Sequence, residues 1–309
     1  MRLPLTFEYT DKKLICTEGE FSGSIVLSIG GISTDDLYIM FKNSSSYELV
    51  EFLDFDFANR CRNKAYLAFL NVDISKPIEI VFHTSKGEVS ALYEFAEPKQ
   101  DQENKFVSYI IDKENSVGIF TLNECRFNKT YKETLNSFFT EIKANNIKTV
   151  IVDLRKNGGG DSRVADRFIQ YLNVDQYIGY GDTHIRKRSI LWKFKSRTTV
   201  NEKIEDLLFC GDLYVLTSKN TFSSATMFAT KISDNGIGKI VGEISGGKPT
   251  SYSDTTVFQT PNSRLLFNIS WKLFHRPDRS KDDLPLIPDY PSSAEDALKT
   301  AYEVIAREI

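Results

Sequence analysis

The chain has 309 residues, of which 41% are hydrophobic and 12% aromatic, and its formal net charge is −3 at pH 7. This length and composition allow two domains with substantial cores. The slightly acidic balance lacks the excess of Lys and Arg that a nucleic-acid-binding protein carries, so we expect no nucleic-acid partner. No apolar run approaches the roughly 18 residues of a transmembrane helix, so we expect no membrane span.

The N-terminal segment MRLPLTFEYTDKKL has one arginine and no apolar stretch after it, so it does not predict a signal peptide. The four cysteines, Cys16, Cys61, Cys125 and Cys210, are far apart and form no CxxC pair. This spacing favours reduced thiols, with the cytoplasm as the default compartment. Scattered Cys and His residues also predict no metal site, and we expect no cofactor.

Residues 1–96 predict a small domain of short strands with one or two helices. Within it, GSIVLSIGGISTDDLYIMFKNSSS combines a strand, a Gly30-Gly31 turn and a helix with Leu37, Met40 and Phe41 facing inward. This motif resembles the latter half of a PDZ domain, which would offer a sheet edge to a peptide. The alternative is a small α+β module that only packs on the rest of the protein.

The segment EPKQDQENK, residues 97–105, has no aliphatic or aromatic side chain and is interpreted as a linker. After it, FVSYIID and SVGIFTLN predict paired strands, and a helix follows with Leu135, Phe138, Phe139 and Ile142 at helical spacing. Strands and helices then alternate. Residues 106–309 therefore predict an α/β core with right-handed crossovers.

A glycine-rich loop follows a predicted strand in KTVIVDLRKNGGGDS. The strand ends at Asp153, and Asn157 and three glycines precede the next helix. Glycines let the backbone approach a ligand closely and turn N–H groups toward an anion. The loop lacks the Gly-Lys-Ser/Thr ending of a P-loop and does not match GxGxxG, so phosphate binding is the weaker hypothesis.

Two adjacent serines, Ser223 and Ser224, follow the predicted strand LYVLTS and begin a helix with Ala225, Phe228 and Ile232 on one face. A hydroxyl at this position lies near the positive end of the helix and near unpaired backbone N–H groups, which suit an attacking oxygen and the oxyanion that it creates. The alternative is that one of these serines only caps the helix.

Lys248 lies 25 positions after Ser223, in the turn that ends GKIVGEISGGK. A surface lysine is normally solvated, but a lysine in an apolar pocket loses its proton more readily because desolvation penalises the charge. A neutral lysine can act as a general base. The sequence therefore contains the residues for a serine nucleophile with a lysine base.

Together the three motifs resemble the S41 peptidase family of tail-specific or C-terminal processing proteases, in which a DLR-N-x-G-G loop, a T-x-S-x-x-E-x-F-A helix and a G-E-x-x-x-G-K turn occur in this order. The family's serine stands five residues before the helix phenylalanine, here Phe228. The resemblance therefore implies Ser223 as nucleophile and Lys248 as base. It also implies an oxyanion hole from the N–H of Ser224 and one from Gly158, Gly159 or Gly160, of which we favour Gly159.

The resemblance further implies a ClpP/crotonase-like spiral for the core and a supporting role for a helix-end aspartate, here Asp234. Two positions depart from the family pattern. The acidic residue three positions after the serine is Thr226, and the glutamine that supports the lysine is Tyr252, which can still donate a hydrogen bond to an amine. Members of the family often carry a signal and a helical segment upstream, so the compartment stays open.

The histidine-dependent branch of the family has a D-G-H-T motif, and this chain has none. Its only histidines are His83, His184 and His275, which favour structural or surface roles. The stretch at residues 176–199 is rich in Arg, Lys and aromatic residues and predicts a substrate-cleft lip or a solvated hairpin rather than a nucleic-acid site. Residues 252–274 alternate around a Pro-Asn-Ser turn and predict a second hairpin.

The function predicted from the sequence is that of a serine endopeptidase that cleaves peptide bonds through an acyl-enzyme, with a peptide or unfolded protein as substrate. A catalytically silent peptide-binding module of the same fold is the alternative, which Thr226 and Tyr252 favour. A crotonase-type enzyme acting on acyl-CoA would share the fold but not the serine and lysine motifs.

Overall fold

The structure is a computed structural model that describes residues 1–97 and 105–308. It divides into two compact units, Met1–Asn104 and Lys105–Ile309. Each unit has a hydrophobic core of its own. Most of the segment interpreted as a linker, residues 97–105, lies outside the described residues.

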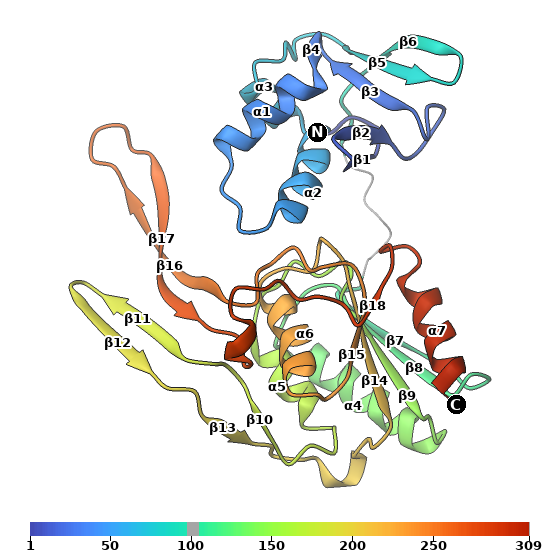
Figure 1. The fold of residues 1–309 in the computed structure, drawn as a ribbon, viewed down its shortest axis with the longest axis vertical. Coiled ribbons are helices and arrows are strands. Elements are labelled where there is room, and N and C mark those ends of the chain that lie inside the picture. Colours follow the sequence, from blue (N-terminus) through green and yellow to red (C-terminus); the bar gives the residue numbers. More distant parts are fainter. Residues whose placement is uncertain (98–104, 309) are drawn as a thin grey trace. The chain divides into compact units, whose positions relative to one another are not determined.

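The first unit is an antiparallel sheet with three helices (Figure 1). The strand order is β1-β2-β3-β5-β6, and β4 pairs with β3. The elements are β1 Phe7–Thr10, β2 Lys13–Cys16, β3 Ile25–Ile29, β4 Ile32–Ser33, α1 Thr34–Ser44, α2 Val50–Arg60, α3 Lys64–Phe69, β5 Ile78–Thr84 and β6 Gly87–Tyr93.

The predicted strand, turn and helix of this unit are confirmed. Gly30 and Gly31 form the turn at φ 58° and 82°, values that favour glycine. Ser33 caps α1 by accepting a hydrogen bond from the N–H of Asp36 at 3.1 Å. Leu37 and Phe41 of α1 are fully buried. The unit has three helices where one or two were predicted, because α2 and α3 also bury apolar side chains against the sheet.

The second unit is built on a six-stranded sheet of order β18-β15-β14-β9-β8-β7. All neighbouring strands run parallel except β7, which is antiparallel to β8. The strands are β7 Val107–Asp112, β8 Val117–Leu122, β9 Thr149–Asp153, β14 Asp212–Thr217, β15 Lys239–Gly242 and β18 Tyr290–Pro291, and the helices are α4 Lys129–Ala144, α5 Arg163–Ile169, α6 Ser224–Asp234 and α7 Ala297–Glu308.

Helices cover both faces of this sheet, which makes three layers (Figure 1). Side chains alternate along each strand, so Val150 and Val152 face the core under α4, α5 and α6, whereas Ile151 faces α7. Because the central strands are buried on both faces, their sequences are continuously apolar rather than alternating. The α/β alternation predicted for residues 106–309 is confirmed.

The second unit has two smaller sheets besides the six-stranded one. The first of these consists of the strands β10 Gln176–Ile178 and β13 Thr198–Val200. The other has the order β12-β11-β17-β16 and joins two hairpins, β11 Thr183–Lys187 with β12 Ile190–Phe194 and β16 Ser251–Gln259 with β17 Leu266–Phe274. Both predicted hairpins are thus present, and they extend together away from the layered core (Figure 1). Among the described residues, no helix has the length and hydrophobicity of a transmembrane segment.

A buried ion pair ties the end of β17 to α6. Arg276 contacts Asp234 through two hydrogen bonds of 2.7 and 2.9 Å, and their side chains are 2% and 0% exposed. Asp234 also accepts the backbone N–H of Asp278 at 3.0 Å. Arg276 donates further to three backbone carbonyls of residues 281–285. The ion pair and these hydrogen bonds offset the desolvation penalty of burying the arginine.

We predict that Asp234→Ala destabilises the protein by roughly 3–5 kcal/mol, because it leaves the Arg276 guanidinium buried without a counter-charge. Chemical unfolding with circular dichroism measures this. The exposed pair Lys299–Glu303 is the control, since its partners are 75% and 50% exposed and Glu303→Ala is expected to cost less than about 1 kcal/mol. Equal effects of the two substitutions would contradict the structural role given to Asp234.

Candidate active site

Three motifs from distant parts of the sequence meet at one edge of the six-stranded sheet. The glycine loop follows β9, the serine turn follows β14 and the lysine turn follows β15. These strands are parallel neighbours, with Asp153 in register with Leu216 and Thr217 with Gly242. Because the carboxyl ends of parallel strands lie at the same edge, the segments that follow them are brought together, as in other open α/β sheets.

Ser223 lies at the strand-to-helix turn in a conformation that non-glycine residues rarely adopt. Its backbone has φ 52° and ψ −122°, and it is the residue before α6. The side chain is exposed and makes no capping hydrogen bond to the helix. The alternative that Ser223 is a side-chain helix cap is therefore not supported, although its carbonyl accepts the first helical hydrogen bond from Met227 at 3.0 Å.

The glycine loop packs directly against this turn. A Cβ atom on Gly159 would lie only 2.7 Å from the Cβ of Ser223 and 3.1 Å from the backbone nitrogen of Ser224. Gly159 also has φ 106°, so both its conformation and its surroundings require glycine. The N–H of Phe222 donates to the carbonyl of Asn157 at 3.0 Å, which fixes the loop to the serine turn.

Backbone N–H groups converge beside Ser223, but they differ in availability. The N–H of Ser224 has no acceptor among the described residues, nor do those of Gly158 and Gly160. The N–H of Gly159, the donor that we favoured, instead donates to Oδ1 of Asn157 at 2.9 Å. In this structure it is therefore engaged, while its neighbours are free to bind an anion.

Asn157 was noted in the motif, but its structural role was not predicted. Its side chain is fully buried and joins the glycine loop to the end of β8. Oδ1 accepts the Gly159 N–H, and Nδ2 donates to the carbonyl of Leu122 at 2.8 Å. Oδ1 also accepts a hydrogen bond from the thiol of Cys125 at 3.5 Å, so three buried hydrogen bonds orient the side chain and, through it, the loop.

The lysine turn approaches the serine from the other side. The N–H of Gly247 donates to the carbonyl of Thr221 at 3.3 Å, and a Cβ on Gly247 would lie 3.0 Å from the nitrogen of Ser223. The same Cβ would lie 2.8 Å from Oγ1 of Thr226, which donates to the Thr221 carbonyl. The small side chain of Thr226, at the position where the family has an acidic residue, leaves room for this turn.

Lys248 follows Gly247 and is half-buried. Within the described ranges, its amine forms no ion pair and no hydrogen bond, including none to the hydroxyl of Ser223. Tyr252, proposed as its support, is 66% exposed in β16, and its hydroxyl likewise makes no hydrogen bond that the structure describes. The backbone of the lysine turn thus packs against the serine turn, while the two predicted catalytic side chains form no hydrogen bond with each other.

Asp234, the third residue with a predicted supporting role, lies at the opposite end of α6 from Ser223. Ten residues of helix at 1.5 Å each separate its position from Ser224, or about 15 Å. Its carboxylate is occupied by Arg276. The structure therefore gives Asp234 a packing role and brings it into no contact with the serine turn.

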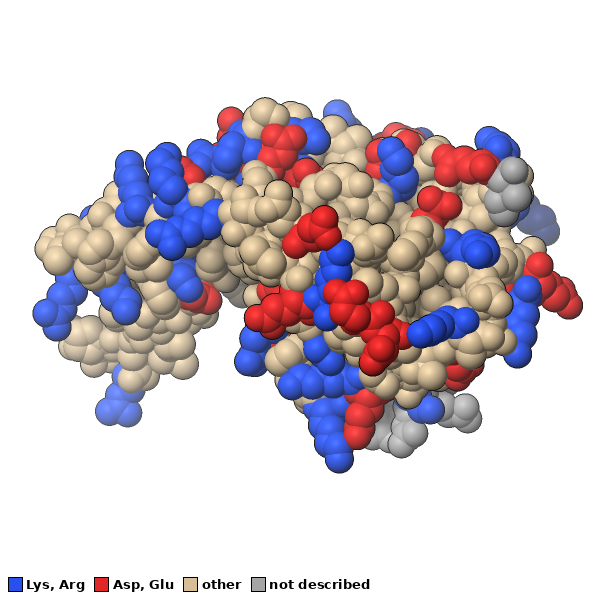
Figure 2. Space-filling view, turned by 90° about the horizontal axis from the view of Figure 1, so that it is seen from below, with Lys and Arg blue, Asp and Glu red and all other residues tan. Residues whose placement is uncertain are grey.

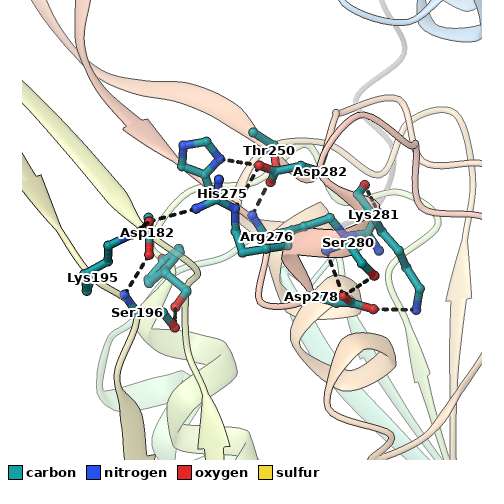
Figure 3. A network of polar contacts seen from close by, with 12 residues as sticks. Asp182, Lys195, Ser196, Thr250, His275, Arg276, Asp278, Ser280, Lys281 and Asp282 are labelled. Atoms are coloured by element: carbon teal, nitrogen blue, oxygen red, sulfur yellow. Dashed lines mark hydrogen bonds and ion pairs between the residues drawn. The ribbon is translucent and has the colours of Figure 1, made fainter.

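His275 is buried and paired, in contrast to the exposed His83 of the first unit. Its Nδ1 lies 2.7 Å from Oδ2 of Asp282, and Oδ1 of that aspartate accepts the hydroxyl of Thr250, two residues after Lys248 (Figure 3). Burial alone would raise the pKa of Asp282. The hydrogen bonds from Thr250 and His275 outweigh this desolvation, so the pKa of Asp282 is lowered.

His184 stacks edge-on against His275, with ring centroids 4.9 Å apart. Desolvation, reinforced by the neighbouring His275, lowers the pKa of His184. No group of three or more His, Cys, Asp or Glu side chains in the described ranges is arranged to hold a metal ion. His184 and His275 therefore belong to a polar network at the base of the two hairpins.

Comparison with known proteins places these observations in a family. The model of peptidase family S41 matches residues 116–290, which is more than half of the chain. No curated protein matches. Among solved structures, mature CPAF aligns with 99% of this chain and 81% of its own at 12% identity and a TM-score of 0.65.

Two further structures share the fold at similarly low identity. A photosystem II D1 C-terminal processing protease aligns with 98% of this chain and 75% of its own, at 15% identity and a TM-score of 0.51. A putative peptidase from Parabacteroides merdae covers 89% of both chains at 14% identity and a TM-score of 0.52. With the family model spanning the glycine, serine and lysine motifs, the chain belongs to peptidase family S41.

Proposed function

We propose that this protein is a serine endopeptidase of the C-terminal processing type, in which Ser223 attacks the substrate carbonyl and Lys248 is the general base. The Ser223 Oγ forms a bond to the carbonyl carbon as its proton passes to the Lys248 amine. The lysine then returns this proton to the leaving amine as the peptide C–N bond breaks. Water hydrolyses the resulting acyl ester and regenerates the serine.

The conformation of Ser223 is the observation that carries this proposal. A non-glycine residue at φ 52° and ψ −122° costs about 1–3 kcal/mol, and such strain persists where function requires it. The turn exposes the hydroxyl at the end of a strand and the start of a helix, as the nucleophile turn of other serine hydrolases does. Glycine would relieve the strain but would remove the nucleophile.

The second support is the set of N–H groups beside the serine. The free N–H of Ser224 and an N–H of the glycine loop would stabilise the negative charge that develops on the substrate oxygen. Gly159 serves in this role only after its N–H leaves Asn157, whereas Gly158 and Gly160 offer donors without such a change.

Lys248 is supported as the base by its position. Its turn packs against the serine turn, and within the described residues its half-buried amine has no ion-pair partner. The proposal also covers the fold and the substrates.

We propose that the core is a ClpP/crotonase-like spiral and that the first unit is a PDZ-like module that binds extended peptide ends. The proposed substrates are peptides or unfolded proteins.

A silent peptide-binding module is the second candidate. It is favoured by the exposed Tyr252 and by the missing hydrogen bond between Lys248 and Ser223. Catalytic hydrogen bonds often tighten only when substrate binds, so the open arrangement is compatible with the first proposal as well. The experiments below separate the two.

A serine-directed fluorophosphonate probe identifies the nucleophile. We expect the wild-type chain to be labelled, Ser223→Ala to lose labelling and turnover, and Ser224→Ala to retain much of both, because Ser224 contributes its backbone N–H. Labelling that depends on Ser224 instead would overturn the assignment. No labelling of the folded wild-type protein would favour the silent module.

Stability measurements test the strain independently of activity. Ser223→Gly is expected to be more stable than Ser223→Ala by about 1–2 kcal/mol, which is the relieved strain less the entropic cost of glycine. The matched pair Ser224→Gly and Ser224→Ala should show the reverse order. Ser224 has no positive φ, and both substitutions remove the same hydrogen bond from its hydroxyl to the carbonyl of Gly160, so the lower helix propensity of glycine decides the difference. Urea unfolding of the four variants measures both differences.

The identity of the base is tested by substitution and by pH. Lys248→Ala is expected to lower kcat/KM by roughly 10²–10⁴-fold. In the wild type, kcat/KM should still increase above pH 7, because a lysine abstracts the proton as a neutral amine and this fraction grows with pH. An ordinary histidine, with a pKa of about 6.5, would give a plateau there.

The control for this experiment is His275→Asn, which keeps a donor toward Asp282 but cannot titrate in this range. It should preserve the shape of the pH profile. If activity survives Lys248→Ala and the increase with pH disappears in His275→Asn, then the lysine is not the base.

A further inference from the structure

The sheet β12-β11-β17-β16 carries an unusual concentration of exposed apolar side chains. Of the large hydrophobic residues that are exposed in the described parts of the chain, half lie in this sheet or its turns. They are Ile190, Leu191, Trp192, Phe194, Tyr252, Val257, Phe258, Leu265, Leu266, Phe267 and Ile269. Contiguous apolar surface of this kind marks an interaction site in a folded protein.

The same sheet is strongly basic. Residues 183–197 and 251–274 contain eight Lys and Arg but only one acidic residue, Asp254, in a chain of net charge −3. Lys272 pairs with Asp254, and Lys195 pairs with Asp182. The other six cations have no acidic partner within the described residues. Figure 2 shows Lys and Arg gathered, with little acidic surface, over the lobe at the left, where Figure 1 places these hairpins.

One edge of the sheet is open and regular. Strand β12 pairs only with β11 among the described strands, and all five of its residues are exposed. The opposite edge, β16, contains Asp254 at φ 51°, which interrupts its extended backbone. An unpaired, regular strand can bind an extended polypeptide through backbone hydrogen bonds.

The apolar residues lie on both faces of the sheet. Leu191 and Trp192 are consecutive in β12, and Val257 and Phe258 are consecutive in β16, so each pair points to opposite faces. A flat bilayer would cover one face only. A polypeptide strand added at the edge places its own side chains alternately on both faces, which matches this distribution. A second copy of the chain would bring like charges together at this surface.

A network of polar contacts anchors the base of the sheet (Figure 3). Asp182 accepts hydrogen bonds from Lys195 at 2.9 Å and from the N–H of Ser196 at 3.0 Å, and Asp282 joins His275 to Thr250. Strand β16 begins at Ser251, three residues after Lys248, a span of at most about 10 Å of extended chain. The β16 end of the sheet is thus joined to the lysine turn by a short stretch of chain.

We propose that strand β12 and its basic, apolar sheet capture the substrate, and that the substrates are extended polypeptide segments in which acidic and apolar residues alternate. The inference rests on the proposed peptidase function and names its substrate class. Backbone pairing along β12 provides the binding register, apolar side chains pack on both faces, and Arg186, Lys187 and Lys193 bind the acidic groups.

Binding is tested with the full chain carrying Ser223→Ala, so that no turnover is required. Fluorescence anisotropy compares an acidic–apolar peptide with a peptide of the same sequence in which Lys replaces each acidic residue. We expect the acidic peptide to bind at least about tenfold more tightly and to weaken with salt. N-methylation of alternate amides in the acidic peptide should remove most of its affinity, because it blocks strand pairing.

The protein side is tested by the triple variant Arg186→Glu, Lys187→Glu and Lys193→Glu, which should lose the preference for the acidic peptide. The triple variant Arg186→Lys, Lys187→Arg and Lys193→Arg is its matched control and should keep it. Equal affinity for both peptides, or no effect of N-methylation, overturns the proposal. Stronger binding of anionic vesicles or oligo-dT than of the acidic peptide also overturns it, in favour of a membrane or nucleic-acid surface.

Failure of the two proposals can be told apart. If the probe does not label Ser223 but the acidic peptide binds through β12, then the binding surface is supported and the peptidase assignment is contradicted. If peptides are cleaved without preference between the acidic and basic versions, the peptidase assignment stands and the surface has another role.

Discussion

The parallel pairing of β9, β14 and β15 is the constraint on which the candidate site depends. Segments that are about 65 and 25 residues apart in sequence become neighbours only because their strands end at the same edge of the sheet, in the registers Asp153–Leu216 and Thr217–Gly242. Double burial of these strands, under α4, α5 and α6 on one face and α7 on the other, stabilises this alignment. The segments of the site therefore follow strands that are buried on both faces.

Close backbone approach explains the composition of the site. The loop and the lysine turn both contact the serine turn where they carry glycine, since a Cβ on Gly159 or Gly247 would overlap the backbone or side chain of Ser223 and its neighbours. Hydrogen bonds from Phe222 to Asn157 and from Gly247 to Thr221 hold the three segments at this separation. These contacts compensate for the strained conformation of Ser223, which would otherwise relax.

Features with a local signature could be predicted from the sequence. Helical and strand periodicity located the elements of the core, and the strand-to-helix turn around Ser223 followed from the apolar run and the helical spacing after it. Features that depend on distant partners could not be predicted. The pairing of Arg276 with Asp234, 42 positions apart, the burial of His275 on Asp282 and the hydrogen bond that occupies the Gly159 N–H leave no local pattern. The joining of β11 with β17 into one sheet is of the same kind.

The polar network at the base of the hairpins links the proposed chemistry to the proposed substrate surface. Thr250 lies between Lys248 and β16, and its hydroxyl both donates to Asp282 and accepts the N–H of Arg276 at 3.1 Å. Arg276 in turn is fixed to α6, the helix that begins at the serine turn. Both ends of α6 thus contact the segment from Gly247 to Arg276. Gly247 packs against the turn at the start of the helix, and Arg276 pairs with Asp234 at its end. A shift of the sheet on binding polypeptide would therefore act on the backbone that carries the lysine, because the chain between them is short and held at both sides.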